Sequence, residues 1–296
     1  MMMTQHYKWI FTIVFSLLYF SACEIINPAE QIPAYLKIEP FDLTTRSFEG
    51  SNTSKITDAW VYVGGELLGA FPLPATIPVL QEGTKELVID PGINENGIEA
   101  LPQIYPFYRR YSKMINLVSN ETININPTTK YKENLTFALI ENFESDFHAL
   151  KEDLDEDETT IVEFFKGEAA SGIGSGRIVL TKENPLIIVA SLARFENLPT
   201  DGSSQVYLEM DYKTDIILEV GLRGLNSSGF GVNSFTRGVR PNSEWNKVYM
   251  NLTEPLAESQ LDAYKLAFKA TFPSTDFSQS EAIILLDNIK IVYSKL

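Results

Sequence analysis

The sequence predicts an all-β protein made of two domains in succession. Runs of alternating apolar and polar residues recur along the chain, at YLKIEPFDL (35–43), ETININPTTKYK (121–132) and QVYLEMDYK (205–213). Turn-forming residues separate these runs, and the two-residue alternation is that of half-buried strands. Because 44% of the 296 residues are hydrophobic, the chain can also bury a sizeable core.

The first domain is expected over residues 36–135. In AWVYVGGELLGAFPLPATIPVL (59–80), two apolar runs flank Gly64-Gly65, which predicts a hairpin. The run KELVIDPGINENG (85–97) predicts a strand closed by Pro91-Gly92. This order resembles the small Ig-like or PEGA-like β-sandwich repeats of exported proteins. The resemblance implies an N-terminal Ig-like β-sandwich and identifies no ligand.

The second domain is expected over residues 136–296. Strand-like runs follow one another here, and the segment begins near Phe143-Glu144 and ends with Asp287-Asn288-Ile289. An early "FE" strand and a late "DNI" strand resemble the galactose-binding-like jelly roll of many carbohydrate-binding modules. The resemblance implies a C-terminal β jelly roll in which these two strands pair. Because that fold hosts sugar binders, protein binders and spacers, it favours binding over catalysis without naming a ligand.

The start of the chain has the features of a secretory signal. Trp9 to Phe20 form a twelve-residue uncharged, mostly apolar segment behind Lys8. A helix of that length covers about 18 Å, which is too short for a bilayer core of about 30 Å. A signal peptide over residues 1–22 is therefore expected instead of a spanning helix.

The single cysteine of the chain, Cys23, directly follows the small residues Ser21 and Ala22. This arrangement resembles the lipobox of Bacteroidota-type lipoproteins, although Phe20 holds the position usual for leucine. The resemblance implies that Cys23 is acylated, by palmitate or a similar chain, and becomes the first residue of an outer-membrane lipoprotein. An ordinary cleaved signal and an uncleaved anchor are the alternatives. Residues 23–35 then read as an extended tether.

The charge of the chain excludes one class of partner. The formal net charge is −15, and removal of residues 1–22 takes away one lysine and no acid, which makes it one unit more negative. A field of this sign repels phosphate backbones, so nucleic acid is not an expected partner. Contact with the membrane is expected through the lipid.

Histidine is too scarce for common catalytic sets. The chain contains only His6 and His148, and His6 lies in the signal segment. A Ser-His-Asp triad would depend on His148 alone, and a zinc site would lack a second imidazole. We therefore expect that the protein is not an enzyme, although a pair of carboxylates could still act in hydrolysis.

A structural calcium ion is the one cofactor that the sequence suggests. In jelly-roll binding modules an acid near the first strand and one near the last often hold calcium, and the resemblance nominates Glu144 and Asp287. Hydrogen bonds from turn amides to these carboxylates are the alternative. The acidic run KEDLDEDETT (151–160) has EF-hand spacing at its start, but Glu158 and Phe164 stand at the glycine and glutamate positions, so it predicts a solvated acidic loop or a looser calcium site.

One polar face of the second domain could bind a ligand. Alternation in straight strands places Tyr207, Glu209 and Asp211 opposite the apolar positions of their run, and Glu219 and Arg223 opposite those of the next. If the two strands are adjacent, the five side chains form one surface with an aromatic ring and polar groups, as a sugar site requires. An ordinary solvated face with cross-strand ion pairs is the alternative.

Two functions agree with these observations. The leading hypothesis is a non-enzymatic, lipid-anchored outer-membrane lipoprotein that acts as an accessory or binding subunit beside an outer-membrane protein partner. The alternative is a surface glycan-binding protein that uses the jelly-roll face. An exposed row of aromatic residues on that face would favour this alternative. The sequence does not separate the cell-surface orientation from the periplasmic one.

Overall fold

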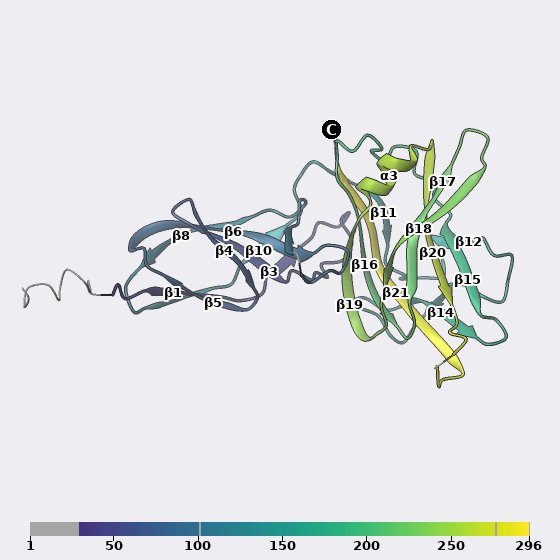
Figure 1. Ribbon diagram of the computed structural model, residues 1–296, viewed down its shortest axis with the longest axis horizontal. Coiled ribbons are helices and arrows are strands. Elements are labelled where there is room, and N and C mark those ends of the chain that lie inside the picture. The colour runs from purple at the N-terminus through teal and green to yellow at the C-terminus, as the bar shows by residue number, and fades with distance from the viewer. Residues whose placement is uncertain (1–29, 101, 276, 296) are drawn as a thin grey trace, which may run out of the picture.

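The computed structural model describes residues 30–100, 102–275 and 277–295 (Figure 1). Strands dominate both halves of the described chain, and no helix in it is long and apolar enough to cross a membrane. The all-β prediction is confirmed. Cys23 and the signal segment lie outside the described residues, so the lipid anchor stays a prediction.

The N-terminal sandwich, our name for strands β1–β10, is built from short antiparallel and parallel pairs. A three-stranded sheet has the order β5-β1-β9, β10 pairs with β2, and a larger sheet has the order β4-β3-β6-β7 with β8 also on β6. The bounds are β1 Ala34–Ile38, β2 Asp42–Thr44, β3 Asp58–Val63, β4 Glu66–Pro72, β5 Ala75–Val79, β6 Gly83–Asn94, β7 Pro102–Ile104, β8 Tyr111–Leu117, β9 Thr122–Ile125 and β10 Thr128–Lys130.

The hairpin at Gly64-Gly65 is confirmed, because β3 and β4 pair on either side of it and both glycines have positive φ. The predicted strand end at Pro91 is wrong. Strand β6 continues through Pro91, which pairs with Ala59 of β3. On its other edge β6 changes partner here, from β8 up to Ile89 to β7 from Gly92 onward. The missing N–H of the proline therefore falls between two partner strands, where a strand tolerates it.

The jelly roll, our name for strands β11–β21, consists of two facing sheets. A six-stranded sheet has the order β13-β14-β21-β16-β19 with β11 also on β21, and a five-stranded sheet has the order β12-β15-β20-β17-β18. The bounds are β11 Leu135–Glu141, β12 Leu150–Asp153, β13 Glu163–Phe165, β14 Ser175–Thr181, β15 Leu186–Ser191, β16 Val206–Thr214, β17 Leu218–Leu225, β18 Gly231–Val239, β19 Asn242–Asn251, β20 Ala263–Thr271 and β21 Glu281–Ser294.

The early and late strands of the jelly roll pair as expected. Strand β11 is antiparallel to β21 and its last residue, Glu141, pairs with Ile289. The Phe143-Glu144 dipeptide lies just past the end of β11. Phe143 has a φ of 46°, so the chain turns there.

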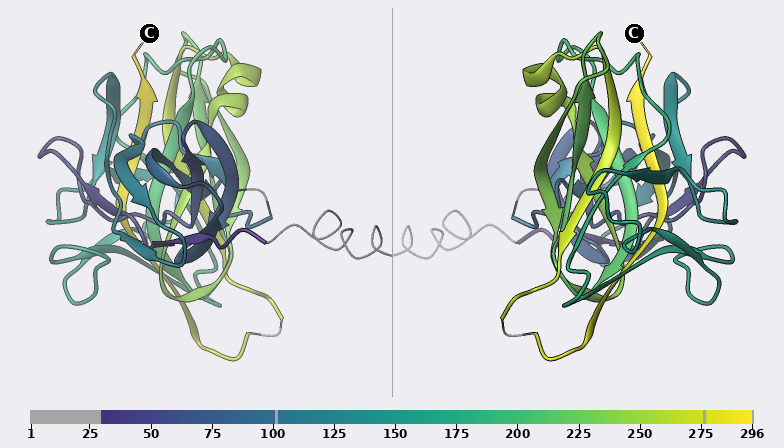
Figure 2. Two further views of the ribbon diagram at one scale, coloured as in Figure 1. Left: turned by 90° about the vertical axis from the view of Figure 1, so that its left-hand side faces the viewer. Right: turned by 90° about the vertical axis from the view of Figure 1, so that its right-hand side faces the viewer.

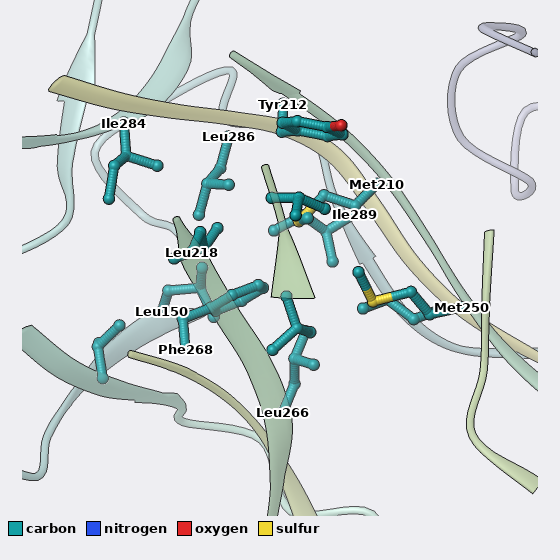
Figure 3. Close-up of a cluster of buried hydrophobic side chains, with 14 of the residues drawn as sticks. Leu150, Met210, Tyr212, Leu218, Met250, Leu266, Phe268, Ile284, Leu286 and Ile289 are labelled. Atoms are coloured by element: carbon teal, nitrogen blue, oxygen red, sulfur yellow. The ribbon is translucent and has the colours of Figure 1, made fainter. Parts of the chain in front are cut away.

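The core of the jelly roll lies between its two sheets. The predicted inward positions Leu208 and Met210 of β16 belong to one apolar cluster with Leu218 of β17 and Phe268 of β20. Figure 3 shows Met210, Leu218 and Phe268 in this cluster. The alternation within each of these strands is thus confirmed. A short helix, α3 (Thr253–Ser259), covers one end of the jelly roll, with Leu256 in the jelly-roll core, and was not anticipated from the sequence.

The N-terminal sandwich packs on the side of the six-stranded sheet that faces away from the jelly-roll core. Tyr207, Tyr249 and Val292 of that sheet belong to the apolar cluster of the sandwich, not to the jelly-roll core. The views in Figure 2 show the sandwich in front of this sheet from one side and behind the jelly roll from the other. The outer face of the five-stranded sheet consequently lies at the far end of the molecule from β1 (Figure 1).

Candidate ligand-binding face

The first three residues of the predicted polar face are buried between the sandwich and the six-stranded sheet. Tyr207, Glu209 and Asp211 are 2%, 0% and 4% exposed, respectively. They do face away from the jelly-roll core, as predicted, but residues of the N-terminal sandwich cover them. The expectation of a solvent-facing site at these three residues is therefore wrong.

Glu209 is the centre of this buried contact. Its carboxylate accepts hydrogen bonds from the hydroxyls of Tyr105 at 2.7 Å and Tyr131 at 2.7 and 2.8 Å, and the Lys247 ammonium lies 3.9 Å away. Burial and the Glu209 charge raise the pKa of Tyr105 and of Tyr131 well above the ordinary value. Both phenols therefore stay protonated and act as donors, which a buried carboxylate requires.

A second polar contact joins the loop before β3 to the same sheet. Asp211 accepts a hydrogen bond from the Thr53 hydroxyl at 2.6 Å and lies 3.5 Å from the Lys247 ammonium. The Lys290 ammonium donates to the Ser51 carbonyl at 2.7 Å. Desolvation lowers the pKa of Lys290 to about 8. These groups bind the two parts of the chain to each other.

Glu219 and Arg223 lie elsewhere. Strand β17 belongs to the five-stranded sheet, whereas β16 belongs to the six-stranded sheet, so the predicted adjacency of the two runs is wrong. The chain crosses from one sheet to the other between them, as expected in a jelly roll. The five predicted side chains therefore divide into a buried set of three and a partly exposed set of two.

Glu219 and Arg223 belong to a polar surface that we call the outer face, formed by the outward side chains of β12, β15, β20, β17 and β18. Lys269 of β20 pairs with Glu219 at 3.1 Å, and Lys265 pairs with Glu152 of β12. The Arg223 guanidinium donates to the Asn233 side chain at 2.9 Å. Among the described residues Arg223 has no carboxylate partner.

A row of small residues crosses the outer face between these polar groups. Ala190, Ala267 and Gly221 are cross-strand neighbours on β15, β20 and β17, and the row ends at Phe235 of β18. All three small residues are buried. Phe235 is half-buried, with the Lys269 ammonium 5.9 Å from its ring centroid.

Phe235 is the one aromatic side chain at the outward positions of the described strands of this sheet. The described strands of this sheet thus present a single outward aromatic ring, not the exposed aromatic row that would favour glycan binding. A continuous apolar surface does not form either, because Arg223 and the two lysine–glutamate pairs lie among the apolar positions. That Phe235, Lys265 and Lys269 share this surface could not be predicted from the sequence, because their strands lie beside β17 only in the folded sheet.

The two predicted calcium ligands contact the same loop. Asp287 accepts hydrogen bonds from the amides of Ala170 and Ser171 at 3.0 and 3.1 Å, and Glu144 accepts one from the Ile173 amide at 3.2 Å. This is the arrangement named as the alternative to a metal. Within the described ranges no group of three or more histidine, cysteine or acidic side chains is placed to hold a metal. A structural calcium ion stays an untested prediction.

The acidic segment 151–160 folds on itself. Asp153 accepts hydrogen bonds from the amides of Asp155 and Glu156, both at 3.0 Å. Asp157 accepts one from the Thr159 amide at 3.0 Å. Asp155 accepts one from the Ile188 amide at 2.5 Å. Asp153 and Asp157 thus cap local turns, and Asp155 bonds strand β15, which agrees with the solvated acidic loop. The looser calcium site stays a prediction.

No protein-family model and no curated protein matches this chain. Solved structures similar to it include the CBM22-1 xylan-binding domain of Paenibacillus barcinonensis Xyn10C, with 11% identity and a TM-score of 0.39 over 56% of this chain and 99% of that one. A family 30 carbohydrate-binding module of Clostridium thermocellum has 15% identity and a TM-score of 0.33, covering 53% and 92%. TmCBM61, solved with β-1,4-galactotriose, has 12% identity and a TM-score of 0.30, covering 47% and 85%.

These structures are carbohydrate-binding modules of the β-sandwich type, the class that the sequence resemblance named for the second domain. At such identities and scores the similarity identifies neither a ligand nor a binding residue. Function is therefore inferred from the surfaces of this chain.

Proposed function

We propose that this protein is a non-catalytic glycan-binding protein that uses the outer face of its five-stranded sheet. The observation that supports this most is the division of the two jelly-roll faces. The sandwich covers one sheet, and the other remains open with Arg223, Phe235 and two lysine–glutamate pairs on its surface.

The chemistry of the outer face suits hydroxyl groups. A sugar presents donors and acceptors around its rim and a C–H surface on its ring. Arg223 and Asn233 can bind adjacent hydroxyls, while Phe235 offers a surface for the ring beside them. Lys269 and Glu219 add a donor and an acceptor on the other side of the small-residue row.

The proposed lipid anchor is compatible with this use. Acylation at Cys23 would attach the chain at the end where β1 lies, and the outer face is at the opposite end (Figure 1). A tethered protein would then present the outer face away from the membrane. Acyl chains contribute on the order of 0.8 kcal/mol per buried methylene, so several chains would hold the protein firmly.

A glycan array probed with the protein lacking residues 1–22 tests the proposal. The array contains β-1,4-linked xylo-, gluco- and galacto-oligosaccharides and bacterial surface polysaccharides. We expect binding that falls in Arg223→Ala and in Phe235→Ala and persists in Arg110→Ala, a matched exposed arginine of the sandwich that pairs with Asp90. An array that is silent with folded protein would refute the proposal.

A second candidate function is the accessory subunit of an outer-membrane protein complex. One observation favours it: the hairpin that joins β17 to β18 exposes Phe230 and Val232 by 69% and 55%. Exposed apolar side chains of this size are typical of protein contacts. Recovery of one outer-membrane protein in fixed ratio from detergent extracts, lost in Phe230→Ser, would support this candidate, and recovery of the chain alone would exclude it.

A further inference from the structure

We propose that the junction cleft, the cavity between the loop after β6 and strands β16, β18 and β19, is a second saccharide site that takes a short neutral oligosaccharide. This site is separate from the outer face and would bind its ligand independently. Both parts of the chain contribute to it, so it exists only when the sandwich and the jelly roll are docked.

The cleft has the size of a ligand site. Its volume is about 640 Å³, within the range of pockets that hold small molecules. A smaller cavity of about 90 Å³ shares Gly97, Glu99 and Tyr212 with it and extends to Lys55 and Asn246. The two cavities are neighbours at the junction of the two domains, where ligand sites often occur.

The walls of the cleft present charges of both signs. Glu99 projects from the loop of the sandwich, and Arg240 from the turn between β18 and β19. Both are exposed, and neither has a hydrogen-bond or ion-pair partner within the part of the chain that the structure describes. A ligand with a single charge would meet a like charge on one wall, which disfavours simple anions and cations.

A phenol and an amide add neutral polar groups. The Asn246 side-chain amide donates to the Tyr212 hydroxyl at 2.8 Å, so the hydroxyl proton of Tyr212 is available for another acceptor. Burial raises the pKa of Tyr212, which keeps that proton in place. The Lys55 ammonium donates to the side-chain oxygen Oδ1 of Asn246 at 2.8 Å and fixes the orientation of the side-chain amide.

A saccharide satisfies all of these groups at once. Each hydroxyl both donates and accepts, so one can donate to Glu99 while others accept from Arg240 and from Tyr212. Single amino acids and other small zwitterions would match the charges, but they would fill only a small part of the volume. The combination of size, opposite charges and a phenolic donor therefore favours a neutral oligosaccharide.

Hydrogen exchange with mass spectrometry distinguishes this site from the outer face. The protein lacking residues 1–22 is incubated with neutral β-1,4-linked tri- and tetrasaccharides of xylose, glucose and galactose. We expect slower exchange in segments 94–100 and 238–248. Protection there should be lost in the double variant Glu99→Gln/Arg240→Met and retained in Arg223→Ala. In Tyr212→Phe, the saccharide concentration that gives half of the full protection should rise at least about threefold.

Each other outcome decides the proposal. Protection confined to strands β17 and β20 would overturn the cleft site and leave the outer face supported. Protection confined to the cleft would support the second site and contradict the proposal that the outer face binds saccharide. Absence of protection everywhere, with every saccharide at millimolar concentration, would overturn both.

Discussion

The His148 imidazole is 5% exposed and lies 5.4 Å from the Phe143 ring, measured between ring centroids. Its Nδ1 has no partner among the described residues. Any histidine-based catalytic site would require His148, since it is the only histidine outside the expected signal segment. In the fold, burial and the Lys151 charge disfavour the protonated ring more than the Val162 backbone and Asp146 favour it.

This burial predicts a pH dependence of stability. Desolvation and the nearby Lys151 charge lower the pKa of His148 in the folded protein. The unfolded chain therefore takes up a proton at a higher pH than the folded chain, and stability falls as the pH falls below about 6.5. In urea unfolding at pH 7 and pH 5, His148→Gln should lose less stability on acidification than the wild type. Equal losses would show that His148 does not titrate differently in the two states.

The glycine at position 176 is explained by an aromatic contact. A Cβ atom added there would lie 2.5 Å from a ring carbon of Phe143, closer than van der Waals contact. We expect Gly176→Ala to destabilise the fold by about 1–3 kcal/mol, as overpacking does. Gly167→Ala is the matched control, because its nearest atom, in the Phe165 ring, is 3.3 Å away. Similar losses in both variants, measured by urea unfolding, would contradict this account.

At the scale of strands, the sequence predicted the alternation of β16 and β17 correctly and the neighbours of these strands incorrectly. The polar positions Glu209 and Asp211 have the pattern of a solvated face. What covers them is the sandwich, whose tyrosines come from about 80 to 100 residues earlier in the chain. Alternation reports which positions share a face, but it contains no information about what packs on that face.

Glu209 and Glu219 therefore make a matched pair of substitutions. Glu209→Ala would leave Lys247 and two phenols without their buried partner, and a loss on the order of 3–5 kcal/mol is expected. Glu219→Ala removes only a partly exposed pair with Lys269, for which a loss below about 1 kcal/mol is expected. Equal effects in chemical denaturation would show that the sheet beneath the sandwich is not the buried joint described above.

At the scale of the whole molecule, the two-part all-β architecture was predictable from alternation and turns. The docking of the parts was not, because it depends on long-range contacts. Tyr207, Tyr249 and Val292 of the jelly roll complete the apolar cluster of the sandwich. The junction cleft and the open outer face both follow from this docking, which explains why neither could be located from the sequence.

The shared cluster predicts that the sandwich and the jelly roll unfold together. After removal of residues 1–22 two tryptophans remain, Trp60 in β3 and Trp245 in β19. The variants Trp60→Phe and Trp245→Phe then each report on one part by fluorescence. We expect coincident midpoints for the two reporters in urea. Midpoints that differ by 1 M or more would contradict a single cooperative unit.

The central claim, that the outer face binds glycan, is tested most directly by calorimetric titration of the best array ligand into the wild type and Arg223→Ala. Hydrogen bonds to a charged group contribute about 1.5–3 kcal/mol, so the variant should bind roughly 10- to 100-fold more weakly with unchanged thermal stability. Equal affinity of the two proteins would place the binding site elsewhere and contradict the account.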